Sequence, residues 1–290
     1  MSAVALTEAD IAHLKTWEGR TQTVEDVVAP DRAVAMAATL DWTHAPEEGD
    51  VLPPGWHWMF FNGAARQSEL GPDGHPKRGG FLPPVPLPRR MWAGGRLTFG
   101  AGLRIGERAR RESTVAKVEA KRGRSGDLVF VVVRHRIFGA AGLAIEEEHD
   151  IVYREPPAPG AETAKPAPAP ADPVWRREIH PDPVLLFRYS ALTFNGHRIH
   201  YDHPYATKVE GYPGLVVHGP LIATLLLDLL GRERPAAKLD RFAFRAVSPL
   251  FDTAPFSVNG APTPGSGAVQ LWAAGPDGRL AMSAEAVLGG

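Results

Sequence analysis

The chain has 290 residues, enough for two domains of about 150 residues each. Apolar residues make up 44% of it and charged residues 22%, an average globular composition that excludes a chain disordered throughout. Lys and Arg total 32 against 33 for Asp and Glu, so no overall positive field favours nucleic acid or an anionic membrane. The absence of cysteine excludes disulfides, thiolate zinc sites and a cysteine nucleophile.

The N-terminal segment 1–15 differs from targeting sequences. It lacks the basic start and apolar run of a signal peptide, and its acidic residues are unlike a transit peptide. The longest apolar run, 221–230, is far shorter than the roughly 20 residues of a membrane helix. We therefore expect a cytoplasmic protein with no membrane partner and no nucleic-acid partner.

A Pro- and Ala-rich segment interrupts the chain at 155–173. Its composition breaks helices and strands, which is typical of a semi-extended linker. It divides the chain into a first half, residues 1–154, and a second half, residues 174–290. Each half is close to the usual size of a domain.

In the first half, residues 30–40 predict a short helix with Pro30 in its first turn. Residues 55–65 predict a buried aromatic segment, and its part 55–61 is expected to be core rather than the lining of an acyl pocket. Strand signals begin at Arg96. The segments 113–120, 128–138 and 143–153 are rich in Val, Ile and Phe and are separated by turn residues, which predicts an antiparallel meander.

In the second half, 182–192 fits either a helix or a strand. Residues 220–230 predict a helix with Pro220 at its start and Gly231 just past its end, apolar on nearly every side and therefore enclosed by protein. Four short strands follow, at 241–247, 255–259, 268–274 and 280–288. The pattern predicts an α+β fold in which a curved antiparallel sheet encloses a helix, present twice.

Three histidines, His197, His200 and His203, fall within seven residues. A metal site is one interpretation, although Pro204 favours a loop over the helix that would align such ligands. Coincidence of surface and core histidines is a second. The favoured interpretation is acid–base chemistry, because histidine titrates near neutral pH and a second hydrogen-bonding group nearby can point at the same water.

Gly219 stands nineteen residues after His200, directly before the apolar helix. The first N–H groups of a helix lack intrahelical partners and carry the positive end of the helix dipole, so they can bind a developing oxyanion. A histidine base with an oxyanion hole suits proton transfer next to a thioester carbonyl. Gly219 as a simple helix cap remains the alternative.

The stretch FNGHRIHYDHPYA, followed by GYPGLVVHGPLIATLL, resembles the MaoC-like, (R)-specific enoyl-CoA hydratase and hydroxyacyl-thioester dehydratase family. The string GGFLPPVPLPRRMWAGG at 79–95 is similar to its double-hot-dog branch, which includes 3-methylfumaryl-CoA (mesaconyl-CoA) hydratases and itaconyl-CoA hydratase-like proteins. The resemblance covers nearly the whole chain except the linker. It implies a double hot-dog with two antiparallel sheets, each around a central helix.

The resemblance also implies roles for single residues. The family's catalytic histidine falls on His200, the following aspartate on Asp202, and the oxyanion glycine on Gly219 after His218. We expect Asp202 to support His200 without itself contacting the substrate. The alternative is that Asp202 caps the next turn.

One departure from the family concerns its catalytic aspartate, because this chain has Asn195 at that place and His197 where the motif has asparagine. An asparagine can hold a water molecule but cannot take its proton. We therefore expect His200 to carry more of the proton transfer, with His197 or Asp202 tuning its tautomer and charge.

Family membership implies a coenzyme A or acyl-carrier thioester as substrate, whose phosphates favour arginine. The candidates for substrate binding are Arg89, Arg90, Arg198 and His218. No metal and no redox cofactor is expected, since coenzyme A arrives as part of the substrate. The first half is expected to be non-catalytic and to enclose the acyl chain, leaving one active site per chain.

The function that follows is a hydro-lyase that adds or removes water across the C2–C3 double bond of an enoyl-CoA thioester, first of all mesaconyl-CoA. An (R)-3-hydroxyacyl-thioester dehydratase of fatty-acid metabolism is one alternative. Another is an acyl-CoA thioesterase, for which the apolar helix offers only Asp228 as a carboxylate. A non-catalytic acyl-CoA-binding protein is the third. A double hot-dog is complete as one chain, and many pair further, so a homodimer is left open.

Overall fold

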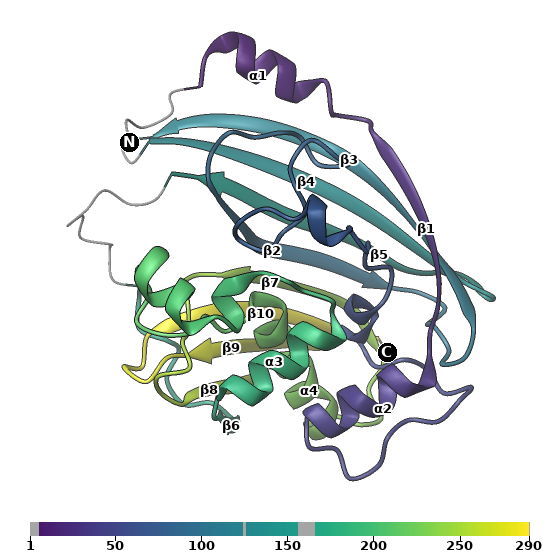
Figure 1. The fold of residues 1–290 in the computed structure, drawn as a ribbon. Helices are drawn as coiled ribbons and strands as arrows, with labels where there is room; N and C mark the ends of the chain where they lie inside the picture. Colours follow the sequence, from purple (N-terminus) through teal and green to yellow (C-terminus); the bar gives the residue numbers. More distant parts are fainter. Residues whose placement is uncertain (1–5, 124–125, 156–165, 290) are drawn as a thin grey trace.

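The computed structural model describes residues 6–123, 126–155 and 166–289. It combines one large antiparallel sheet with a few helices (Figure 1). The helices are α1 (Glu8–Lys15), α2 (Pro30–Thr39), η1 (Trp56–Met59), η2 (Gln67–Glu69), α3 (Pro183–Leu192), η3 (Arg198–His200), η4 (Tyr205–Val209) and α4 (Gly219–Glu233). The strands are β1 (Thr21–Val27), β2 (Arg89–Phe99), β3 (Arg108–Gly123), β4 (Gly126–Gly139), β5 (Gly142–Arg154), β6 (Trp175–Ile179), β7 (Leu239–Ala246), β8 (Phe256–Pro262), β9 (Ala268–Ala274) and β10 (Leu280–Leu288).

The ten strands form a single sheet in the order β1-β3-β4-β5-β2-β7-β10-β9-β8-β6. The first half supplies five neighbouring strands and the second half the other five. Strand β2 pairs with β7 from Gly94↔Arg245 to Thr98↔Arg241. The two expected sheets are therefore joined edge to edge, which leaves neither β2 nor β7 as an open edge.

Two glycines allow this junction. A Cβ on Gly94 would lie 2.6 Å from the carbonyl oxygen of Phe244, and a Cβ on Gly95 would lie 2.9 Å from the Phe244 ring. That ring packs against Trp92, with ring centroids 5.6 Å apart, and against Trp58 at 6.1 Å. Aromatic side chains of both halves thus meet directly beneath the β2–β7 pair.

Helix α4 is the buried helix that the sequence predicts. All ten residues from Leu221 to Leu230 are buried, and the helix packs on β6, β8, β9 and β10. It continues to Glu233, so Gly231 lies inside its last turn rather than past its end. None of the helices in the described ranges combines the length and apolar character that a membrane span requires.

Segment 182–192 is resolved in favour of a helix, α3, because the Asp182 side chain accepts a hydrogen bond from Leu185 N and caps it. In the first half, the helix at 30–40 is confirmed as α2, which packs against α3. The sequence missed α1, β1 and β6, and it placed the start of β2 too late. The aromatic segment Trp56–Phe61 is buried, which confirms its prediction as core.

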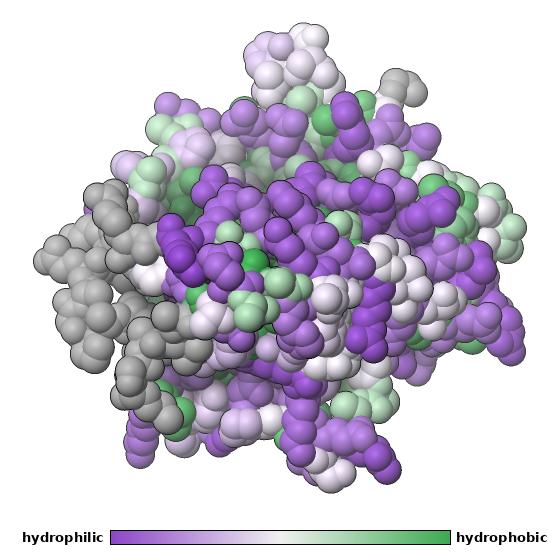
Figure 2. All heavy atoms as spheres, turned by 90° about the horizontal axis from the view of Figure 1, so that it is seen from above, coloured by the Kyte–Doolittle hydropathy of each residue, from purple (hydrophilic) through white to green (hydrophobic). Residues whose placement is uncertain are grey.

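The boundaries of the halves remain a prediction, because much of the expected linker, 156–165, lies outside the described residues. The described part runs beside the turn between β9 and β10, where Ala169 N donates to Gly278 O at 2.9 Å. The side of the molecule on which α1 lies is mainly hydrophilic, with apolar residues in small patches (Figure 2).

We predict that Phe244→Ala lowers the free energy of unfolding by about 3–5 kcal/mol, because it opens a cavity where the two halves meet. Val34→Ala is the control: Val34 is 51% exposed, and its loss is expected to cost less than about 0.5 kcal/mol. Urea denaturation of both variants measures the difference. Equal stabilities would contradict the role of this junction.

Candidate active site

The loop that carries the sequence motif, residues 194–203, follows α3 and is named here the histidine loop. The chain reverses at Phe194, whose φ of 49° lies in the left-handed region that is strained for a phenylalanine. Asn195 then closes a short turn, its Oδ1 accepting a hydrogen bond from His197 N at 3.0 Å. This turn leads into η3, which ends at His200.

His200 is buried, with 7% of its surface exposed. Its Nδ1 lies 2.7 Å from the carbonyl oxygen of Val216, so Nδ1 carries the proton and donates it. The lone pair therefore resides on Nε2. Burial lowers the pKa of His200 to about 4, with the Val216 hydrogen bond opposing this shift, so the ring is neutral near pH 7. It has the tautomer and charge of a general base.

His218 lies directly against His200, with the two rings stacked at a centroid distance of 3.7 Å. Its Nε2 is 2.8 Å from the hydroxyl of Ser190, and burial holds the pKa of His218 well below its ordinary value. His218 is also the N-cap residue of α4, so Gly219 is the first residue of that helix. The structure therefore places the predicted oxyanion donor next to the neutral pair of imidazoles.

His197 also packs against His200, edge to face, with ring centroids 5.4 Å apart. Burial first, and then the neighbouring His75 and His200, lower the pKa of His197 to about 2. The ring of His75 lies 4.1 Å from that of His197. The histidine cluster thus extends into the first half of the chain.

His75 comes from a tight turn at 71–75, named here the first-half turn, in which Gly71 N donates to His75 O. Asp73 Oδ2 lies 3.0 Å from His75 Nδ1. Although burial raises the pKa of Asp73, the hydrogen bond and charge of His75 outweigh it and hold that pKa below the usual range. Burial lowers the pKa of His75.

The first-half turn is fixed to the histidine loop through backbone atoms. Arg198 N donates to Asp73 O at 2.9 Å, and the Arg198 guanidinium donates to Pro72 O at 2.9 Å. Gly74 has a φ of +87°, and a Cβ there would lie 1.9 Å from Gly196 O. Only glycine fits where the two segments meet.

Asp202 and Arg198 differ from their expected roles. The Asp202 carboxylate pairs with Arg198 at 2.7 Å and accepts from Tyr205 N at 3.1 Å. These contacts hold the end of the histidine loop, and no hydrogen bond joins Asp202 to His200 within the described ranges. Asp202 is therefore a cap, and Arg198 is occupied in joining the two segments.

The adjacent arginines Arg89 and Arg90 have different surroundings. Arg89 forms an ion pair with Glu210 at 3.3 Å and lies over the ring of Tyr212. Arg90 lies beside the phenol of Tyr153, where its charge opposes the burial that raises the pKa of Tyr153. In the part of the chain that the structure describes, no carboxylate lies within ion-pair distance of Arg90.

A second buried polar cluster, centred on Glu147, packs next to Trp92 in the first half. Glu147 accepts from Trp58 Nε1 at 3.1 Å and lies 3.1 Å from His57 Nε2 and 3.0 Å from His149 Nε2. Burial raises the pKa of Glu147, but His149 and His57 together hold it well below its ordinary value. The His149 ring packs on Trp92 in a tilted arrangement with centroids 4.1 Å apart, so this cluster supports the aromatic side chains of the junction.

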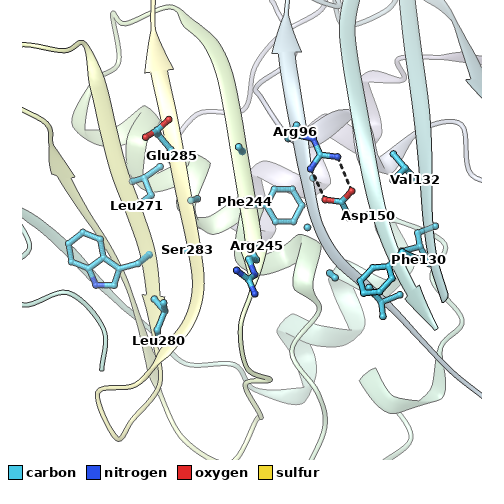
Figure 3. A pocket seen from close by; sticks show the side chains of 18 of the residues that line it. Arg96, Phe130, Val132, Asp150, Phe244, Arg245, Leu271, Leu280, Ser283 and Glu285 are labelled. Atoms are coloured by element: carbon cyan, nitrogen blue, oxygen red, sulfur yellow. Dashed lines mark hydrogen bonds and ion pairs between the residues drawn. The ribbon is translucent and has the colours of Figure 1, made fainter. Parts of the chain in front are cut away.

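A groove also lies away from these residues. This groove of about 760 Å³ is lined by residues on the sheet face away from the helices, which are drawn behind the strands in Figure 3. Arg96 and Asp150 form an ion pair at 2.7 Å beside it. None of the predicted site residues lines this groove, so its size does not make it the candidate site.

A model of the hydroxyacyl-thioester dehydratase type 2 family matches residues 55–252. The chain is 52% identical over 280 residues to mesaconyl-C(4)-CoA hydratase of Chloroflexus aurantiacus, an alignment that covers 94% of this chain and 97% of that protein. The chain belongs to the hydroxyacyl-thioester dehydratase type 2 family.

Solved structures confirm the fold. A MaoC-like dehydratase from Phytophthora capsici superposes with a TM-score of 0.69 at 15% identity, covering 96% of this chain and 98% of that one. A Mycobacterium tuberculosis protein described as having a double hot-dog fold superposes with a TM-score of 0.58 at 13% identity, covering 94% and 96%. The expected α+β double hot-dog is therefore confirmed.

The structure brings together Asn195, His197, His200, His218 and Gly219, all from the second half. It adds Asp73 and His75 from a half expected to be non-catalytic. The spacing of Asp73 and His75 carries no motif, although the sequence Gly71-Pro72-Asp73-Gly74 signals a tight turn. Asp73, His75 and His197 also offer three ligand atoms within 4.8 Å of one another, the donor types of a metal site.

We predict that Gly74→Ala lowers kcat/KM by about 100-fold, because the new methyl group pushes the first-half turn away from the histidine loop. Gly79→Ala is the matched control: Gly79 also has a positive φ, +93°, but its Cβ would have only Pro84 near, at 3.8 Å. Steady-state kinetics on an enoyl-CoA substrate compares the two. Equal losses would show that backbone strain, and not the approach to Gly196, is responsible.

Proposed function

We propose that this protein is a hydro-lyase that hydrates the C2–C3 double bond of an enoyl-CoA carrying a free carboxylate, with mesaconyl-C(4)-CoA as its substrate. The observation that carries the proposal is the neutral, buried His200, with a free Nε2, beside the N-terminus of α4. The 52% identity to a mesaconyl-C(4)-CoA hydratase over nearly the whole of both chains supports the choice of substrate.

The chemistry follows from these groups. The Gly219 N–H binds the thioester oxygen, where negative charge develops as water adds to the conjugated double bond. Asn195 and the Nε2 of His200 hold the water, and His200 takes its proton while the oxygen bonds to C3. Dehydration follows the same path in reverse. No metal or redox cofactor is part of this proposal, because coenzyme A enters as part of the substrate.

Arg90 is the group that we assign to the free carboxylate of the substrate. Arg89 already has a carboxylate, Glu210, whereas Arg90 has none within ion-pair distance in the described ranges. Arg90 also acts electrostatically on both His75 and His197, so its charge lies near the histidine cluster. A carboxylate bound by Arg90 would lie next to the carbon that receives the water oxygen.

Thioester hydrolysis is the rival chemistry that the structure disfavours. It would need a carboxylate base or nucleophile on α4, where Asp228 is the candidate. The buried Asp228 carboxylate instead accepts hydrogen bonds from Trp42 at 2.6 Å and from Arg232 at 2.9 Å, and also pairs with Arg177. Asp228 is therefore a structural anchor for α4.

Several remaining expectations belong to the same proposal. The partner is a small acyl-CoA thioester and neither nucleic acid nor a membrane. Action in the cytoplasm fits a chain without cysteine. Pairing of two chains into a homodimer is compatible with one complete active site per chain.

We predict that His200→Ala lowers kcat for mesaconyl-C(4)-CoA by about 100- to 10,000-fold, because general base catalysis is lost. Disappearance of the enoyl-thioester absorption band measures turnover. His203→Ala, on the same loop but exposed, is the control and is expected to keep wild-type kcat. Hydrolysis would also remove this band, so the products are identified: wild-type protein that releases free coenzyme A and mesaconate, and forms no hydroxyacyl-CoA, would instead indicate a thioesterase.

We predict that Arg90→Gln lowers kcat/KM for mesaconyl-C(4)-CoA by about 100-fold and changes kcat/KM for crotonyl-CoA by less than about threefold, because crotonyl-CoA has no free carboxylate to bind. Arg134→Gln, half-exposed and paired with Glu148, controls for loss of one positive charge. A parallel loss on both substrates would exclude Arg90 as the carboxylate-binding residue.

A further inference from the structure

The chemistry of hydration requires two proton transfers, one from water and one to C2. His200 serves one of them. The residue at the place of the family's catalytic aspartate is Asn195, and an amide neither accepts nor releases a proton at neutral pH. Its Oδ1 is moreover held by His197 N. A second acid–base group has to come from elsewhere.

The imidazole rings of His75, His197, His200 and His218 follow one another with centroid separations of 4.1, 5.4 and 3.7 Å. Their hydrogen-bond partners differ: His200 faces a carbonyl and His218 a hydroxyl, both neutral groups. Among these four described rings, only His75 has a carboxylate partner, Asp73 at 3.0 Å. A carboxylate stabilises the imidazolium form, as in the Asp–His pairs of hydrolases.

We propose that Asp73 and His75 are the second acid–base pair of this active site, with His75 as a catalytic residue that protonates C2 and Asp73 as its positioning residue. This inference rests on the proposed hydratase function. The pair belongs to the first half, so neither half contains a complete active site.

The protons balance as follows. Water gives one proton to His200 Nε2, and its oxygen bonds to C3. The electron pair of the double bond moves to the thioester oxygen at Gly219, and the resulting enolate takes a proton from His75 at C2. The proton on His200 then passes through His197, which lies between the two rings, to His75. Every residue returns to its starting state and water is the only co-reactant.

The surroundings of His75 set how readily it takes a proton. Burial lowers the pKa of His75, and Arg90 on β2 and Arg78 in the segment before β2 lower it further, whereas Asp73 in the same turn opposes this shift. The substrate's free carboxylate, bound at Arg90, would offset the charge of that arginine. Binding of the correct substrate thus favours the imidazolium of His75, which links substrate choice to catalysis.

Two variants test the pair, with His203→Gln as a matched control on the histidine loop. His75→Gln is expected to lower kcat for mesaconyl-C(4)-CoA by about 100-fold or more and to change KM by less than about threefold. Asp73→Asn keeps a hydrogen-bonding group but removes the negative charge, so the pKa of His75 falls. The alkaline limb of the kcat profile for hydration is therefore expected to move to lower pH, a change that a purely structural role would not cause.

The outcomes separate the two proposals. Suppose that the wild type hydrates mesaconyl-C(4)-CoA and that a folded His75→Gln variant has a kcat within about threefold of the wild-type kcat. This result would overturn the pair and leave the proposed function intact. Loss of activity on dialysis against a chelator, restored by Zn²⁺, would also overturn it, since Asp73, His75 and His197 would then be metal ligands. A wild type that hydrates neither mesaconyl-C(4)-CoA nor crotonyl-CoA would overturn the proposed function and the pair with it.

Discussion

The pairing of β2 with β7 is the constraint on which the rest of the structure depends. Backbone hydrogen bonds between these strands turn two half-sheets into one, and Gly94 and Gly95 leave room for Phe244 at the contact. Once this register is set, the segment that precedes β2 lies against the loops that precede α4. The first-half turn and Arg90 reach the histidine loop for this reason, although more than 100 residues separate them in the chain.

The position of the site between the halves also determines its electrostatics. Burial lowers the pKa of His197, His200 and His218, so these imidazoles are neutral and can accept protons. Asp73 is a carboxylate that faces this cluster, and Arg90 is a nearby cation for which the described ranges show no carboxylate partner. The proposed substrate, which is both a thioester and a carboxylate, complements this arrangement: in our proposal its two polar ends meet Gly219 and Arg90, with the reacting carbons between them.

Much of the fold was predictable from local sequence patterns. The Val- and Ile-rich strands and the apolar helix with Pro220 near its start follow short-range patterns, and they lie where they were expected. The pairing of His200 with Gly219 also came from a local motif, and its catalytic role stays a prediction. Asp73 and His75 could not be found this way, because their relation to His200 exists only across the β2–β7 junction. Asp202 shows the same limit of local sequence: its spacing fits both a partner of His200 and a turn cap, and the structure shows it in contact with Arg198 and Tyr205.

The most direct test of a shared active site is a crystal structure with methylsuccinyl-CoA, the saturated analogue of the proposed substrate, which cannot be hydrated. The account predicts its free carboxylate on Arg90, its thioester oxygen at the Gly219 N–H, and its C2 and C3 between His75 and His200. A ligand bound in the groove on the outer face of the sheet, or bound by second-half residues alone with the first-half turn out of contact, would contradict it (Figure 3).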